Sequence, residues 1–394
     1  MPETPHDDAP PQPRRRTVPF ECTALLLQGG GALGSYQAGV YEALHTAGIE
    51  PDWIAGISIG AINSDIIAGN APDTRLAALR AFWDAVTDAG DSGWSDMVSG
   101  LWMGEDARRW ANGVAAGWAM MRGVPGFYTP RLPPPQLLPS GTPGAASFYD
   151  TAKLKLTLER LVDFDRINHD KSMRFSVGAV NVRTGNFAYF DNRMVTIVPE
   201  HVMASGALPP AFEAVEIDGE FYWDGGIVSN TPLDWILNNY PLNDTLAFQV
   251  DLWSARGAVP RNLGEVAMRL KEVQFSSRTR ASTDHFRDLQ KVRGALTEVL
   301  ALLPPAVRRS EAAKFLDQVA DPCVYNIVQL IYRSPAWELE SKDYEFSRAT
   351  MRDHWQAGLA DAQRTLAQPQ IFERPRTAQG VQVFDFCSRD GNRP

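Results

Sequence analysis

The chain has 394 residues, of which 44% are hydrophobic and 22% charged, as is typical of a globular protein with a large core in one or two domains. Its formal net charge of −9 argues against a nucleic-acid-binding protein and against simple electrostatic adhesion to anionic lipid. The three cysteines form no disulfide framework and no metal-ligand spacing, so we expect a reducing, cytoplasmic compartment.

Residues 1–20 are rich in proline and charge, and no apolar signal-peptide core follows Arg14, Arg15 and Arg16. We expect this segment to be a disordered tail. No uninterrupted apolar stretch reaches the roughly 20 residues that a membrane span needs. A soluble protein, or one that is peripheral at a membrane, is therefore expected.

A short apolar run at residues 23–27 ends in a glycine-rich turn, and a helical pattern follows from residue 35. The consecutive glycines Gly29, Gly30 and Gly31 can direct successive backbone N–H groups toward one point. The N-terminus of the following helix adds its positive dipole end. Such a turn can stabilise the negative charge that builds on a carbonyl oxygen when an ester is attacked.

A second glycine turn, Gly56-Ile57-Ser58-Ile59-Gly60, follows the apolar run at residues 53–55. Gly-x-Ser-x-Gly between a strand and a helix is the nucleophile-elbow pattern. The reversal is too tight for side chains at its two flanking positions, so glycine stands at both and the Ser58 hydroxyl is held out. An ordinary strand-to-helix turn is the alternative, because glycine and serine are common in loops.

The first turn also matches the dinucleotide-binding fingerprint, as Gly29-x-Gly31-x-x-Gly34. That fingerprint needs an acidic residue about 20 positions further on, at the end of the second strand. Glu50 and Asp52 lie at roughly this distance, but they precede the second apolar run rather than ending it. A nucleotide-binding protein that uses the Gly29–Gly34 loop stays open as an alternative.

Helical patterns follow at residues 36–45 and 74–86, and the chain then changes character over residues 90–150. Helical spacing at 107–121 is followed by a proline-rich stretch that breaks any regular element. Two interpretations stay open for this insertion. It is either a helical insertion docked on the core or an apolar cap over the serine, able to contact a membrane as a peripheral anchor or to line an acyl channel. The insertion carries four tryptophans at eight-residue steps: Trp94, Trp102, Trp110 and Trp118.

Residues 151–162 predict a further helix, and residues 173–198 alternate in blocks that predict strands. The expected strands are 173–180, 186–190 and 194–198, with a hairpin turn between the first two.

Asp224 follows the short aromatic strand at residues 221–223 and is held by Gly225 and Gly226. Beside a serine elbow, such an aspartate is a candidate base, while an Asp-Gly hairpin turn is the alternative. A Ser-His-Asp triad would require a late histidine at a strand end. None of the six histidines has that setting, and His201 is the best of them; the others are His6, His45, His169, His285 and His354. A Ser–Asp dyad needs fewer assumptions.

Four blocks, in this order and spacing, resemble the patatin-like phospholipase family over residues 21–252. They are Gly29–Gly34, Gly56–Gly60, Ala204–Pro209 with Phe212, and Asp224–Gly226 with Asn230 and Pro232. The resemblance implies a three-layer α/β/α fold with a central, mostly parallel sheet, and lipid acyl hydrolysis. It implies Ser58 as nucleophile, Asp224 as base, and Gly29, Gly30 and Gly31 as the oxyanion hole. Many members carry Arg or Lys where this chain has Leu33, which puts a preference for phospholipid headgroups in doubt.

Residues 253–394 extend beyond the catalytic domain and resemble the extension of a bacterial patatin subgroup. We expect helices at 262–286, 292–303 and 338–366, and a strand at 324–331 that could join the main sheet. The buried side of the last helix is expected to carry Tyr344, Met351, Trp355 and Leu359. Completion of the core and binding of a partner are both open roles for this extension.

The expected reaction is hydrolysis of a lipid ester through an acyl-enzyme, with no metal or organic cofactor and no nucleic acid. Hydrolysis of hydroxyacid polyesters or other non-phospholipid esters is an alternative with the same chemistry. A non-catalytic lipid-binding module is an alternative from another class.

Overall fold

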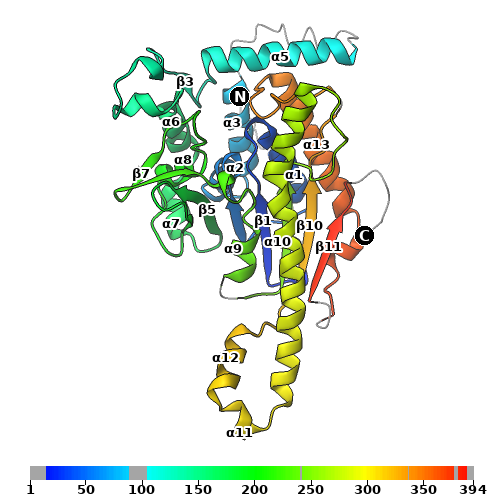
Figure 1. Cartoon of the computed structure of the whole chain (residues 1–394). Coiled ribbons are helices and arrows are strands. Elements are labelled where there is room, and N and C mark those ends of the chain that lie inside the picture. The colour runs from blue at the N-terminus through cyan, green and yellow to red at the C-terminus, as the bar shows by residue number, and fades with distance from the viewer. Residues whose placement is uncertain (1–14, 88–103, 240–241, 336, 377–379, 388–394) are drawn as a thin grey trace, which may run out of the picture.

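The computed structural model describes residues 15–87, 104–239, 242–335, 337–376 and 380–387. Within them, a nine-stranded central sheet has helices on both faces (Figure 1). Its order is β11-β10-β9-β1-β2-β5-β8-β7, and β6 also pairs with β5. The pairs from β11 to β5 are parallel, and β6, β7 and β8 pair antiparallel. The three-layer, mostly parallel α/β fold expected from the sequence is confirmed.

The strands are short and buried in the middle of the sheet. Their bounds are β1 Cys22–Leu27, β2 Trp53–Gly56, β5 Arg174–Asn181, β6 Phe187–Asp191, β7 Val215–Ile217, β8 Glu220–Asp224, β9 Thr245–Asp251, β10 Tyr325–Ile331 and β11 Val381–Asp385. A separate pair of two-residue strands consists of β3 Thr129–Pro130 and β4 Tyr149–Asp150.

Alternation along β1 divides the core between the two faces of the sheet, because successive side chains of a strand point to opposite faces. Leu25 and Leu27 belong to the larger cluster, and Ala24 and Leu26 belong to the smaller one. Helices with side chains in the larger cluster are α1 Ser35–Thr46, α2 Ile59–Ala68, α3 Arg75–Thr87, α6 Ala152–Leu161, α7 Phe164–His169, α8 Pro199–Ser205 and α13 Arg348–Leu366. Helices α9 Leu233–Asn238 and α10 Leu263–Leu302 contribute to the smaller cluster.

The C-terminal extension is built into the same core. Strand β10 pairs with β9, so the expected addition of this segment to the main sheet is confirmed, and β11 adds a further strand. Helix α13 crosses α1 so closely that a Cβ on Gly358 would lie 2.0 Å from the Tyr36 carbonyl oxygen, and one on Gly39 would lie 1.9 Å from that of Trp355. The end of α10, with α11 Pro305–Arg308 and α12 Glu311–Val319, extends beyond the sheet (Figure 1).

Helix α5 Glu105–Arg122 belongs to the described part of the tryptophan-rich insertion, residues 104–150, and it lies across one end of the molecule (Figure 1). The helix expected at residues 107–121 is therefore confirmed, while Trp94 and Trp102 lie outside the described residues. No helix within the described residues has both the length and the apolar character to cross a bilayer.

Three expected elements are wrong. Residues 194–198 form no strand, because β6 ends at Asp191, whose carbonyl oxygen accepts the amides of Met194 and Val195 in a turn. The helices expected at 262–286 and 292–303 are one continuous helix, α10. The last helix begins at Arg348 rather than at 338, because the Ser347 side chain caps it by accepting from the Thr350 amide.

Residues 15–20, expected to belong to a disordered tail, run against the core. Val18 and Phe20 pack on the larger cluster, and the Arg16 amide donates to the Gly48 carbonyl oxygen at 2.7 Å. The first 14 residues of the expected tail lie outside the described residues.

Candidate active site

The strand register brings three turns to one edge of the sheet. Leu27 at the end of β1 pairs with Gly56 at the end of β2, so the two glycine turns begin side by side. Gly56 pairs with Val177 of β5, and Ala179, two residues further along, pairs with Asp224 of β8. Strand β8 runs antiparallel to β5 but begins beyond the carboxyl end of β5, so its last residue, Asp224, still lies near the edge where β2 ends and Ser58 follows.

Ser58 occupies a strained backbone conformation between β2 and α2, with φ 56° and ψ −123°. The turn leaves no room for side chains at its flanks, since a Cβ on Gly56 would lie 2.2 Å from the Gly60 oxygen and one on Gly60 would lie 2.2 Å from the Leu27 oxygen. The Ser58 amide donates to Ser205 Oγ at 3.0 Å, which holds the turn in place. Helix α2 starts at the next residue, so its N-terminus faces the site.

The glycine turn after β1 is held on both sides by other parts of the chain. The Gly29 carbonyl oxygen accepts from Asn230 Nδ2 at 3.0 Å and from Trp253 Nε1 at 2.9 Å. The Gly29 amide donates to the Asn230 carbonyl oxygen at 3.3 Å, and the Ala32 amide donates to the Asp343 carbonyl oxygen at 2.8 Å. Among the described residues, the amides of Gly30 and Gly31 have no hydrogen-bond acceptor, and both glycines line a cavity.

Gly31 has a structural requirement of its own. Its φ of +55° favours glycine, and a Cβ there would lie 2.0 Å from the Asp343 carbonyl oxygen. The backbone therefore bends toward the segment that contains Asp343, in the C-terminal extension.

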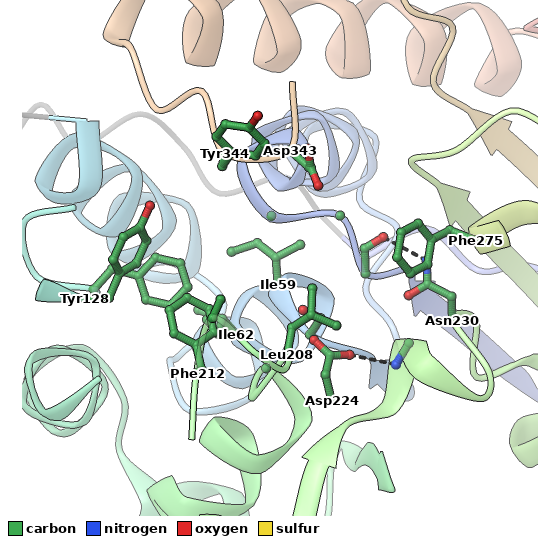
Figure 2. A pocket seen from close by; sticks show the side chains of 18 of the residues that line it. Ile59, Ile62, Tyr128, Leu208, Phe212, Asp224, Asn230, Phe275, Asp343 and Tyr344 are labelled. Carbon is green, nitrogen blue, oxygen red and sulfur yellow. Dashed lines mark hydrogen bonds between the residues drawn. The ribbon is translucent and has the colours of Figure 1, made fainter. Parts of the chain in front are cut away.

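Asp224 is only 2% exposed. One carboxylate oxygen accepts the Gly226 amide at 2.7 Å (Figure 2). Burial raises the pKa of Asp224 to about 7, although the nearby Ser58 side chain and the Gly226 amide act to lower it. Such an aspartate is a stronger base than an exposed one, whose pKa is about 4.

Ser58, Asp224 and the three glycines line a single cavity of about 250 Å³. Its other walls are mainly apolar, and Figure 2 shows Tyr128, Phe212, Ile62 and Leu208 around the space next to Asp224. Tyr344 and Phe346 come from the C-terminal extension and Phe275 from α10. No Lys or Arg is among the described residues that line it.

No histidine is among the described residues that line the cavity. His201 lies in α8, where its ring nitrogen Nδ1 accepts the Val198 amide at 3.0 Å and burial lowers its pKa. His45 pairs with Glu50, and His354 is buried against Glu338. His169 and His285 are not in the cavity wall, and His6 lies outside the described residues.

The acidic residues of the nucleotide-binding alternative lie at the other end of the strands. Asp52 precedes β2 and accepts the Thr23 amide near the start of β1, while Glu50 binds Arg75. Among the described residues, no group of three or more His, Cys, Asp or Glu side chains is placed to hold a metal ion.

Sequence reasoning missed the residues that fix the glycine turn from a distance. The sequence analysis includes Asn230 and Ser205 in the motif blocks of the family resemblance but assigns neither residue a role. Trp253 and Asp343 follow the turn by more than 200 positions, and no local pattern marks either of them. Leu33, the departure from the family pattern, is fully buried in the core.

Two family models match this chain. The model of the family described as patatin-like phospholipase matches residues 25–235, and one described as patatin phospholipase matches residues 273–378. The structure of VipD from Legionella pneumophila is similar at 14% identity and a TM-score of 0.39, covering 92% of this chain and 72% of that one. The comparison with curated proteins gives no match. The chain belongs to the patatin-like phospholipase family, and this membership supports lipid acyl hydrolysis in general.

Proposed function

We propose that the protein hydrolyses carboxylic esters of lipids with Ser58 as nucleophile and Asp224 as base. The observation that carries this proposal is that Ser58 and the buried Asp224 carboxylate line the same apolar cavity, with the Ser58 side chain close enough to the carboxylate to affect its pKa. The raised pKa of Asp224 supports its role, because a base works best when its pKa lies near the working pH.

In the first step, Ser58 Oγ bonds to the acyl carbon while its proton passes to the Asp224 carboxylate. The carbonyl electron pair moves to oxygen, and the Gly30 and Gly31 amides donate to this oxyanion. Gly29 completes the turn, but its own amide already donates to Asn230. Collapse of the intermediate expels the alcohol, which takes the proton from Asp224.

In the second step, Asp224 accepts a proton from water as the water oxygen attacks the acyl-enzyme. The new intermediate collapses and expels Ser58 Oγ, which recovers its proton from Asp224, and the free acid leaves. No step needs a metal or an organic cofactor.

The cavity wall supports an apolar acyl chain as the part of the substrate that it holds. Its charged side chains are Asp224 and Asp343, with no cation among the described lining residues, and Leu33 is buried. We therefore propose phospholipase A-type cleavage in which this cavity holds the acyl chain and not the lipid headgroup. Hydroxyacid polyesters and other non-phospholipid esters are the second candidate substrates, and comparing release from phospholipid, acylglycerol and hydroxybutyrate oligomers separates them.

The test uses a short-chain nitrophenyl ester and a fluorophosphonate probe. Ser58→Ala and Asp224→Asn should each lower kcat by about 10³-fold or more, and the probe should label Ser58 in the wild type. His201→Ala is the matched control and should keep most activity. Near-wild-type rates in a folded Ser58→Ala or Asp224→Asn variant would remove the dyad, and absence of labelling would favour a lipid-binding module.

We also propose that α5 brings the protein to a lipid surface as a peripheral contact. Trp110, Val114, Trp118 and Met121 are exposed at helical spacing on the outer side of α5, and Trp110 is 70% exposed. Met120 of the same helix lines the cavity. A helix with an outward apolar stripe next to an apolar cavity suits the transfer of a lipid ester from a surface into the site.

A further inference from the structure

The C-terminal extension contributes a segment that lies directly over the glycine turn. Residues 338–347, here called the strap, connect β10 to α13 without helix or strand. The Asp343 carbonyl oxygen of the strap accepts the Ala32 amide at 2.8 Å. A Cβ on Gly31 would lie 2.0 Å from the same oxygen. Tyr344 and Phe346 of the strap line the cavity. The strap therefore contacts both the backbone of the turn and the space for substrate.

Lys271 of α10 fixes the strap at this point. Its Nζ donates to Asp343 Oδ1 at 2.8 Å and Oδ2 at 2.9 Å, and to the Glu340 carbonyl oxygen at 3.0 Å. It also lies 5.1 Å from the centre of the Tyr344 ring. Half-buried ion pairs of this kind, with several hydrogen bonds, hold geometry better than exposed pairs.

Helix α10 is itself anchored to the strand edge near the site. One turn after Lys271, Phe275 lines the cavity, and its carbonyl oxygen accepts Gln28 Nε2 at 3.3 Å. The side-chain oxygen of Gln28 accepts the amides of Leu252 and Trp253. Lys271 thus connects the strap to a fixed part of the fold.

We infer that Lys271 and Asp343 form a positioning pair that sets the orientation of the Gly30 and Gly31 amides. This inference rests on the proposed function. With the Ala32 amide bound by the strap, the turn keeps Gly31 at positive φ and leaves the two preceding amides free of acceptors among the described residues. When Lys271 is lost, the Asp343 carboxylate loses its cation, the strap loosens and the amides lose their fixed direction.

The test compares Lys271→Met, Lys271→Arg and Lys291→Met. Lys291 lies on the same helix and pairs with Asp288 at 3.3 Å away from the cavity wall, so Lys291→Met is the matched control. On a short soluble ester, Lys271→Met should lower kcat at least about tenfold with a smaller change in KM, because oriented donors act in the transition state. Lys271→Arg should restore a large part of kcat, and Lys291→Met should leave it unchanged.

Hydrogen exchange gives a readout that does not depend on turnover. Amides in residues 28–35 should exchange faster in Lys271→Met than in the wild type, while those of α13 should not change. Asp343→Ala keeps the carbonyl oxygen but removes the carboxylate, and the double variant should be no worse than either single one. If Lys271→Met does not fold, kcat and the exchange of residues 28–35 in Asp343→Ala test the inference in its place.

Unchanged kcat together with unchanged exchange at residues 28–35 would overturn the inference. Equal losses of kcat in Lys271→Met and Lys271→Arg, with exchange increased throughout the extension, would make Lys271 merely structural and also overturn it. Failure of the proposed function gives a different result from failure of this inference. Hydrolysis would then not depend on Ser58, while hydrogen exchange at residues 28–35 would still show whether Lys271 holds the strap on the turn.

Discussion

At the scale of single residues, Ser58 and Asp224 both occupy states that are unfavourable in isolation. Ser58 has positive φ without being glycine, and Asp224 is buried with a hydrogen bond from the Gly226 amide and no cation partner among the described residues. The surrounding turns enforce both states, through the close contacts at Gly56 and Gly60. The free energy stored there is consistent with a site selected for chemistry rather than for stability.

The raised pKa of Asp224 predicts the pH dependence of the reaction. In the proposed reaction the carboxylate is the active form, and burial raises its pKa to about 7. kcat/KM should therefore fall about tenfold per unit below pH 7 and level off above it. Rates on a soluble ester between pH 5 and 9 measure this profile, with an inactive Ser58→Ala sample as background. A midpoint near pH 4 would mean that Asp224 titrates as an ordinary aspartate or is not the base.

The sequence was informative about those residues whose local pattern has a steric cause. The glycines around Ser58 and after Asp224 are required by contacts within a few positions or with the adjacent strand, so their spacing was visible. The turn at Gly29–Gly31 is visible as a run of glycines, although the nearest atoms to a Cβ on these glycines belong to the distant residues Asn230, Leu252 and Asp343. Lys271, Asp343, Asn230 and Trp253 act through contacts that form only when distant segments fold together, and single-sequence patterns carry no record of such contacts.

At the scale of elements, the helix boundaries expected in the extension differ from those observed. The expected helices leave a gap between residues 286 and 292, but α10 contains no Gly or Pro there and continues through it, exposed on much of its surface. Residues 338–347 are expected to begin the last helix, but they form the strap, and α13 begins at Arg348. The alternation at 194–198 was typical of a strand, but those residues have no partner strand among the described ones.

The crossing of α1 and α13 gives a prediction at this scale. A Cβ on Gly358 would lie 2.0 Å from the Tyr36 carbonyl oxygen, so Gly358→Ala should force the helices apart. We expect a loss of about 1–3 kcal/mol in the free energy of unfolding, measured by denaturant titration. Gly117→Ala in α5 is the matched control, since no atom lies within 4 Å of its Cβ position, and it should be neutral or slightly stabilising. Equal stability of the two variants would contradict the close crossing.

At the scale of the whole molecule, the extension and the candidate catalytic residues form one structure. Strands β10 and β11 continue the sheet, α13 covers α1, and the strap and α10 supply walls of the cavity. The cavity lies at the same end of the molecule as α5, and α11 and α12 lie at the opposite end (Figure 1). With a net charge of −9, attraction to an anionic surface is not what would orient the protein, so apolar contact must do so.

This arrangement predicts that two tryptophans of α5 control access to lipid. Replacing Trp110 and Trp118 together by alanine should weaken binding to phosphatidylcholine vesicles about tenfold or more, because each indole loses apolar contact at the interface. Hydrolysis of vesicle-borne ester should fall in parallel, whereas kcat/KM on a soluble short-chain ester should not change, since neither residue lines the cavity. Vesicle sedimentation measures the first effect and ester kinetics the others.

The matched control replaces Leu302 and Phe315, which are exposed apolar residues at the far end of the molecule. This variant should bind vesicles like the wild type, because the end of α10 and α12 lie at the end of the molecule opposite α5 (Figure 1). Equal loss of binding in both variants would indicate nonspecific adhesion of exposed apolar groups. Wild-type binding by the Trp110 and Trp118 variant would exclude α5 as the contact and leave the cavity to take its substrate from solution.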